Sequence, residues 1–329
     1  MKEYFKETDA EILSREELLC LQGTLEIPMT NDYLFRALLQ ENNRVLKALV
    51  CALLHLKPES VRIVSVENPI ELGKSYGEKD LFLDVKALLD GNIIINLEMQ
   101  VVNEHNWEER SLYYLCSSFV HLNKGMDYLE AKSAVQIGFL NFSLFPEAPE
   151  FYANFYLLNE KTYQKYSDKL RMAVVDLTQI QLATEEDKAY KIDQWAQFFK
   201  SKDWSELAML AKENDDILSA VGTVYQLSRE QQIRQLCEAR MDYYKREGDR
   251  RRRDAMAAEK DRMLDQKEQR LEQKDKQLEQ KEQQVEQKEQ QVEQKERQVE
   301  RKEQQLVERE RKLREKELEV EKMLREING

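Results

Sequence analysis

The sequence predicts a mixed α and β domain followed by a long charged helix, and three observations support this prediction. Two neighbouring segments alternate apolar and polar residues across a glycine-containing turn, which is typical of a β-hairpin. Apolar residues at helical spacing lie before and after this hairpin. Charged residues make up 35% of the chain, and after Gly248 it has no proline and only a terminal glycine. We therefore expect an α/β (α+β) sheet domain, a helical C-terminal extension and a coiled-coil-like helix.

The expected elements follow from residue spacing and residue type. Residues 29–56 have the helical pattern of two helices, with Thr30, Asn31 or Asp32 as the N-cap. Runs rich in β-branched and aromatic residues predict strands, and the segments between them are loops or helices. In chain order we expect a strand at 60–68, a loop at 69–80, the hairpin, a helix at 106–125, strands at 134–145, 151–160 and 169–179, and helices from 187 to about 247.

The hairpin, "DVKALLDGNIIINLEMQ" from Asp84 to Gln100, has one apolar and one polar face. Its odd-numbered residues are apolar in both strands, so the odd face is expected to be core. Partners across the strands share a face, which requires a three-residue loop at 90–92, with Asn92 in the left-handed conformation. This register places Asp84 opposite Glu98, where like charges repel by roughly 0.2–1 kcal/mol.

Two explanations of the acid pair are compatible with the sequence. A hard divalent cation such as Mg²⁺ takes one or two carboxylates and keeps open positions for phosphate oxygens and water. Alternatively, Lys86 on the same face bridges both carboxylates at a solvated surface.

The hairpin, with "MTNDYLFRALL" before it and "ERSLYYLCSSFVHLNKGMDY" after it, resembles the Rpn family of recombination-promoting nucleases and transposase-like proteins, within the PD-(D/E)XK superfamily. "YSDKLRMAVVDLTQ" and "WAQFF" extend the resemblance over about residues 28–240. The resemblance implies a restriction-endonuclease core and a metal-dependent DNA endonuclease of recombination or mobile DNA, with Mg²⁺ or another divalent cation as cofactor and DNA as partner. A catalytically silent scaffold that assembles through its tail is the alternative function.

The resemblance also assigns roles to the residues of the hairpin. It implies that Asp84 and Glu98 bind the metal and that the backbone carbonyl of Met99 completes the metal shell. Gln100 stands where most of the superfamily has a lysine, and there it would position the attacking water. A neutral amide supplies no positive charge, so Lys86 is the candidate for that part of the lysine's role.

Residues outside the hairpin complete the predicted site. The resemblance implies that Asp32 is an acid of the site, although the sequence equally allows it to be an N-cap. Arg110 and Tyr114 match the motif after the hairpin and are predicted DNA contacts, with core packing as the other interpretation of Tyr114. A run of four arginines either contacts phosphate or belongs to a solvated linker. The run consists of Arg250, Arg251, Arg252 and Arg253.

The tail carries a seven-residue repeat with one apolar position. If that position is d, the a positions are mostly glutamates, and Lys288 at g precedes Glu293 at e, a pairing that parallel dimers use. If that position is a, the d positions are lysines, among them Lys274 and Lys281. A homo-oligomer formed through this helix and a solvated single helix both fit a half-charged seam. The apolar residues are Leu264, Leu271, Leu278, Val285, Val292, Val299, Leu306, Leu313, Val320 and Ile327.

From these patterns we predict four segments: an N-terminal extension (1–27), the nuclease core (28–180), a helical subdomain (181–248), and a basic junction with the heptad-repeat helix (249–329). The net charge of −12 argues against coating nucleic acid by bulk charge, although a local basic groove remains compatible with it. The 4 cysteines are scattered, so we expect reduced thiols rather than a zinc site or disulfides. No signal core and no apolar run of about 18 residues is present, so we expect a cytoplasmic protein without membrane contact.

Overall fold

The computed structural model describes residues 13–68, 70–71, 81–82, 84–120, 122 and 125–327. Most of the predicted loop at 69–80 lies outside these residues. The chain divides into two compact units, residues 1–247 and 248–329, and each is described by itself. The predicted boundary at residue 180 falls inside the first unit and stays a prediction.

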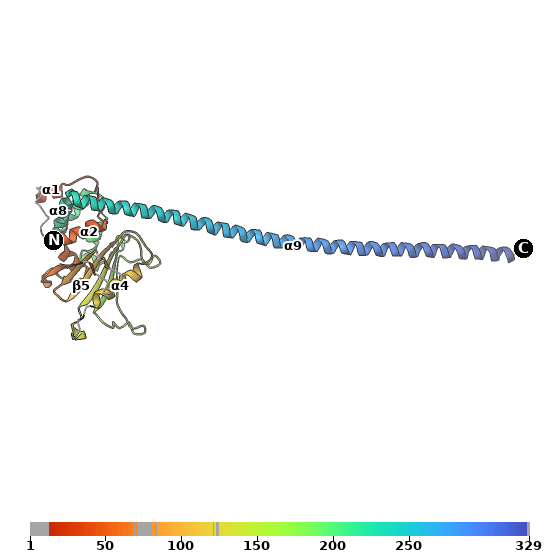
Figure 1. Cartoon of the computed structure of the whole chain (residues 1–329), viewed down its shortest axis with the longest axis horizontal. Helices are drawn as coiled ribbons and strands as arrows, with labels where there is room; N and C mark the ends of the chain where they lie inside the picture. Colours follow the sequence, from red (N-terminus) through yellow and green to blue (C-terminus); the bar gives the residue numbers. More distant parts are fainter. Residues whose placement is uncertain are drawn as a thin grey trace. The chain divides into compact units, whose positions relative to one another are not determined.

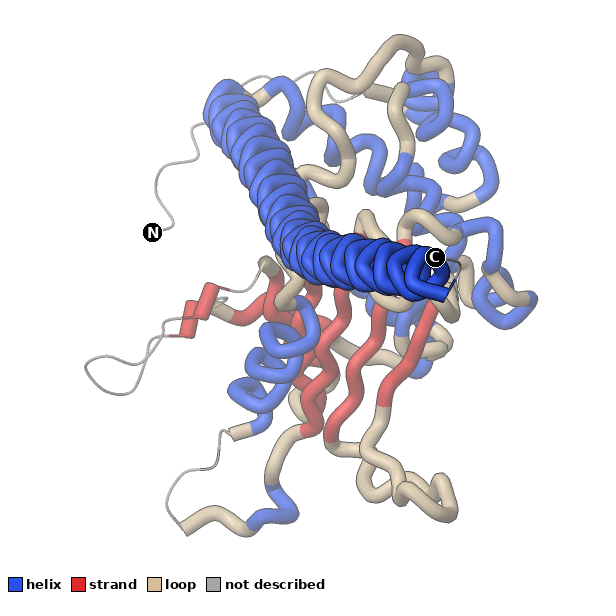
Figure 2. Tube along the Cα trace, turned by 90° about the vertical axis from the view of Figure 1, so that its right-hand side faces the viewer, coloured by secondary structure: helices blue, strands red, loops and turns tan. Residues whose placement is uncertain are grey.

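A mixed six-stranded sheet forms the centre of the first unit in the described part of the chain, with the strand order β1-β4-β5-β6-β8-β7. The central strands β5, β6 and β8 are parallel, and β1, β4 and β7 pair antiparallel with their neighbours. The strands lie side by side in Figure 2. Their bounds are β1 Val64–Glu67, β4 Val85–Leu89, β5 Ile93–Gln100, β6 Ser133–Leu140, β7 Tyr152–Phe155 and β8 Leu170–Asp176; a separate short pair is β2 Ile70–Glu71 and β3 Leu81–Phe82.

Helices cover both faces of this sheet, which confirms the predicted α/β class. On one face a buried aromatic group joins α2, β6 and α6, since the rings of Phe35, Phe139 and Phe199 lie 5.1–5.6 Å apart. On the other face α4 packs against β5, β6 and β8. The helices are α1 Arg15–Leu19, α2 Asp32–Glu41, α3 Asn43–Leu53, α4 Trp107–Phe119, α5 Glu185–Ala189, α6 Ile192–Lys200, α7 Trp204–Glu213, α8 Asp215–Arg229 and α9 Gln231–Ile327, with short 3₁₀ turns at Pro58–Ser60, Tyr128–Glu130 and Ile180–Leu182.

The hairpin has the predicted register. Its ladder runs from the pair Val85–Leu97 to the pair Leu89–Ile93, and the odd face is buried as expected. The left-handed residues of the loop are Asp90 (φ 46°) and Gly91 (φ 77°), so the expectation for Asn92 is wrong. The carboxylate of Asp90 accepts hydrogen bonds from two backbone N–H groups of the preceding segment, which offsets its unfavourable φ.

The even face of the hairpin is covered rather than solvated. Asn96 is 1% exposed, Glu98 3% and Lys86 8%, because α4 lies over this face. The alternative explanation, in which Lys86 bridges the two carboxylates at a solvated surface, is therefore wrong about the surface, because this face is buried. Charges on this face are surrounded by protein, where they interact more strongly than charges in water.

The tail is helical, as predicted, because α9 continues without a break to Ile327 (Figure 1). Side chains from Arg252 to Met323 are exposed, the heptad residues among them by 51–58%. Ion pairs between residues four apart, such as Glu293 with Arg297, support the helix. No helix in the described residues combines the length and the apolar character that crossing a bilayer requires.

The arginine run at the start of the second unit is helical and unevenly exposed. All four of its residues lie within α9. Arg251 is half-buried, whereas Arg250, Arg252 and Arg253 are exposed. Arg250 and Arg251 also have interaction partners within the chain. Three of the four arginines are thus solvated and Arg251 is less so, and phosphate contacts by Arg250 and Arg251 would compete with existing interactions.

Candidate active site

Asp84 lies one residue before the first paired residue of β4, and its side chain contacts β5, the predicted partner strand. Its Oδ2 accepts a hydrogen bond from the backbone N–H of Met99 at 2.9 Å. Burial, and next the charge of Glu98, raise the pKa of Asp84 to about 8, although the Met99 N–H acts in the opposite direction. The structure thus brings Glu98 close enough to Asp84 for its charge to oppose the ionisation of Asp84.

Glu98 lies on β5 beneath α4, and both of its oxygens are hydrogen-bonded. Arg110 Nη2 donates to Oε1 at 2.7 Å, and Gln136 Nε2 donates to Oε2 at 3.1 Å. Burial raises the pKa of Glu98, although both donors favour its charged form. Gln136 on β6 is a site residue that the sequence did not predict, because its contact depends on a parallel pairing between strands far apart in the chain.

Gln100 and Arg110 are bound to each other. Arg110 Nη2 donates to Gln100 Oε1 at 2.6 Å, and Gln100 Nε2 donates to the carbonyl of Val102 at 2.9 Å. Both ends of the amide are therefore engaged. The guanidinium also lies 5.8 Å from the ring of Tyr114, which is buried as its core-packing interpretation expects. Burial, and then the charge of Glu98, raise the pKa of Tyr114.

A glycine allows α4 to approach the sheet and so to deliver Arg110. Gly138 pairs in register with Glu98, and the indole of Trp107, the first residue of α4, lies over it. A Cβ at position 138 would lie 2.2 Å from Trp107 Cζ2, far inside van der Waals contact. An isolated glycine in a strand pattern signals such a close approach, and this signal was available in "QIGFL".

Asp32 is the first residue of α2 and not its N-cap. The cap is Asn31, whose Oδ1 accepts from the N–H groups of Tyr33 and Leu34. Asp32 Oδ2 instead accepts from Arg240, at 2.6 Å from Nε and 2.5 Å from Nη2. The interpretation of Asp32 as a cap is therefore wrong. Arg240 lies 208 residues further along the chain, so the sequence offered no signal for this contact.

Asp32 and Asp84 line the same cavity, which has a volume of about 520 Å³. One wall comes from the start of α2 and another from the first turns of α9, within the first unit. Lys86 is not among the residues that line it. Those residues are Asp32, Tyr33, Arg36, Asp84, Leu236, Ala239, Arg240 and Tyr243.

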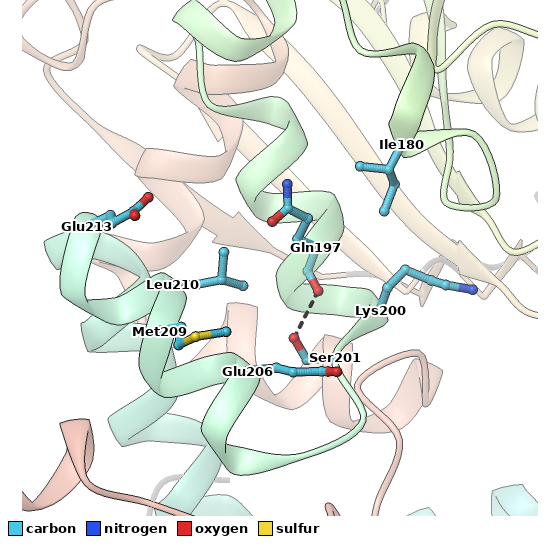
Figure 3. Close-up of a pocket in the computed structure, with 8 residues that line it drawn as sticks. All are labelled: Ile180, Gln197, Lys200, Ser201, Glu206, Met209, Leu210 and Glu213. Atoms are coloured by element: carbon cyan, nitrogen blue, oxygen red, sulfur yellow. Dashed lines mark hydrogen bonds between the residues drawn. The ribbon is translucent and has the colours of Figure 1, made fainter.

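A second cavity, of about 450 Å³, contains none of the predicted site residues (Figure 3). Its two acids, Glu206 and Glu213, are seven residues apart on α7, about 10 Å along a helix. The Ser201 hydroxyl donates to the backbone carbonyl of Gln197. Because its acids are too far apart to share a metal ion, this cavity is not a candidate for metal-assisted hydrolysis.

The acid pair offers the kind of ligands that a hard cation takes. Within the described residues, no group of three or more His, Cys, Asp and Glu side chains is placed to hold a metal ion. Two close carboxylates do suit Mg²⁺, which binds through one or two carboxylates and keeps several waters. The donor set therefore fits a divalent cation with water and phosphate as its further ligands.

The mixed sheet and the acid pair on a central hairpin define a nuclease-like α/β domain. The family model described as "PD-(D/E)XK nuclease family transposase" matches residues 29–251, so the chain belongs to this family. The resemblance drawn from the sequence is confirmed, and the match includes the first turns of α9 that carry Arg240. The match ends at Arg251, so the last two arginines of the run lie outside it. Comparisons with curated proteins and with solved structures find no match to the chain.

Proposed function

We propose that this protein is a divalent-metal-dependent DNA endonuclease that acts in recombination or on mobile DNA. The acid pair carries this proposal, because Asp84 and Glu98 repel each other in a buried setting and Asp84 opens to a cavity. Such an arrangement costs stability in the absence of a cation, and buried acids with raised pKa values are typical of functional sites. Membership of a nuclease-like transposase family supports the same conclusion.

Asp84, Glu98 and the carbonyl of Met99 would hold the cation. When bound, a divalent cation activates a water molecule and neutralises charge on the phosphate. The other residues act on these ligands: Gln136 and Arg110 fix the carboxylate of Glu98, and the Met99 N–H fixes that of Asp84. Hydrogen bonds to the carboxylates of metal ligands hold those ligands in the orientation that binding requires.

The remaining roles within the first unit depend on rearrangement of existing contacts. Gln100 positions the water only if its amide leaves Arg110 or Val102. Lys86 is the candidate for the positive charge, and Asp32 for a further acid once Arg240 releases it.

The proposed DNA contacts come from two parts of the chain. Arg110 and Tyr114 are proposed to contact DNA where α4 meets the site. In the second unit the exposed arginines of the run are the better candidates for phosphate, because Arg251 is half-buried. The exposed members are Arg250, Arg252 and Arg253.

A silent scaffold is the second candidate function, and the exposed apolar stripe of α9 favours it. Nine heptad residues from Leu264 to Val320 are each more than half exposed in the single chain. This stripe also supports a homo-oligomer formed through α9. The endonuclease needs the acid pair to bind a cation, whereas the scaffold does not. The decisive experiment therefore changes that pair.

The test is plasmid nicking with and without Mg²⁺ by the wild type and the Asp84→Asn variant. We expect Asp84→Asn to lose nicking and also to lose the rise in melting temperature that Mg²⁺ gives the wild type by mass action. Glu109→Gln, which removes an exposed acid from α4, should behave as the wild type. Full nicking by Asp84→Asn would remove the assignment to this hairpin, and no nicking by the wild type would favour the scaffold.

A further inference from the structure

The cavity that Asp32 and Asp84 line contains two arginines whose surroundings differ. Arg240 is committed to Asp32 through two short hydrogen bonds, and its guanidinium lies 4.8 Å from the ring centre of Tyr244. Its charge is therefore used within the protein. If a phosphate bound Arg240 instead, the carboxylate of Asp32 would lose its charged partner. That residue is only 8% exposed, so the loss would be costly.

Arg36 has no such commitment. It lies four residues after Asp32 on α2, so both side chains are on the same face of the helix. Its guanidinium carbon lies 4.7 Å from the ring centre of Tyr33, which orients it by a cation–π contact. No carboxylate of the described residues lies within ion-pair distance of Arg36, yet its charge reaches Asp84 across the cavity.

The other basic groups near the acid pair are less available to a ligand. Arg110 is held by Glu98 and Gln100 at 2.6–2.7 Å. Lys86 is buried on the face that α4 covers and does not line the cavity. Gln100, at the position of the superfamily lysine, has no charge. The site therefore needs a cation for the phosphate, and Arg36 is the arginine that faces the cavity without an ion pair to any described carboxylate.

Building on the proposed function, we propose that Arg36 binds a non-bridging oxygen of a DNA phosphate in this cavity and thereby positions the strand beside Asp84. A guanidinium presents a planar fork of donors that matches phosphate, and hydrogen bonds between charged partners are stronger than neutral ones. Tyr33 reduces the freedom of the Arg36 side chain before DNA binds, so less entropy is lost on binding. Arg36 is in this view a substrate-binding residue, whereas Arg240 positions Asp32.

The test compares Arg36→Gln and Arg36→Lys with Arg44→Gln, which removes an exposed arginine from the neighbouring helix α3. Binding of a DNA duplex is measured in EDTA at several salt concentrations. We expect Arg36→Gln to raise Kd about tenfold or more and to reduce the log–log salt slope by about 0.9. Arg36→Lys keeps the charge, so it should keep the slope while nicking more slowly with Mg²⁺. Arg44→Gln should match the wild type in both measurements.

The outcomes separate this inference from the proposed function. If Arg36→Gln keeps the wild-type slope and nicks at the wild-type rate, Arg36 does not contact phosphate, even where nicking depends on Asp84. If the wild type neither binds nor nicks DNA, the proposed function and this inference both fail. If Arg36→Gln melts at a much lower temperature than Arg44→Gln, the nicking rate of Arg36→Lys decides the question, because wild-type nicking by Arg36→Lys overturns the proposed phosphate contact.

Discussion

Two glutamate–arginine pairs in this protein have the same length and different surroundings. Glu98 pairs with Arg110 in the site, and Glu293 pairs with Arg297 in the tail, each at 2.7 Å between nitrogen and oxygen. The glutamate side chain is 4% exposed in the first pair and 63% exposed in the second. Burial, not distance, therefore decides what each pair contributes, because water screens the exposed charges. The same kind of ion pair is therefore weak where it is exposed in the single chain and strong where it is buried in the site.

The largest effect should come from the protonation of the buried pair. The pKa of Asp84 is raised from 3.8 to about 8, so between these values the folded state holds a proton that the unfolded state has lost. Stability without metal should therefore fall as pH rises, by about 1.4 kcal/mol per pH unit and on the order of 5 kcal/mol in total at most. Urea unfolding of wild type and Asp84→Asn from pH 4 to 8 measures the difference. Parallel curves for the two proteins would show that Asp84 is charged in the folded state throughout.

Removing the arginine from each pair tests the comparison directly. Arg110→Gln should destabilise the first unit by about 3–5 kcal/mol, because it leaves the buried Glu98 without its charged partner. Arg297→Gln, the matched change in the tail, should cost only about 0.3–0.5 kcal/mol. Both are measured by urea unfolding followed by circular dichroism. Equal losses in the two variants would mean that the contact distance, and not burial, sets the energy.

The next largest loss of stability should come from changing Gly138, the residue that lets α4 approach the sheet. Gly138→Ala places a Cβ about 2.2 Å from the indole of Trp107, so α4 must move away from β6. We expect a loss of about 1–3 kcal/mol and weaker Mg²⁺ binding, since the shift displaces Arg110 from Glu98. Gly222→Ala in α8 is the control: its added Cβ would lie 3.4 Å from Leu18, and alanine favours the helix. A Gly138→Ala protein as stable as the wild type would show that α4 is free to move.

The sequence predicted the parts of the site that local periodicity determines. The register of β4 and β5 followed from alternation, because two apolar faces must meet the same core. It did not predict that α4 buries the even face, since that depends on Trp107 fitting over a glycine 31 residues later. Nor did it predict the contact of Asp32 with Arg240, which only the packed α9 creates. Partners from distant segments leave no periodic signal, so the acids were found and most of the groups that hold them were not.

The smallest effect on the first unit should come from removing most of the tail. Deleting residues 255–329 removes side chains that are exposed as far as Met323, so the unfolding free energy of the first unit should change by less than about 0.5 kcal/mol. The subunit count by light scattering should nevertheless fall, because the heptad stripe supplies the apolar seam that self-association needs. Val285→Lys with Val292→Lys in the full chain is the finer variant, since it keeps the helix and removes two neighbouring seam residues. Equal subunit counts for the wild type, this variant and the truncated chain would show that α9 is a single solvated helix.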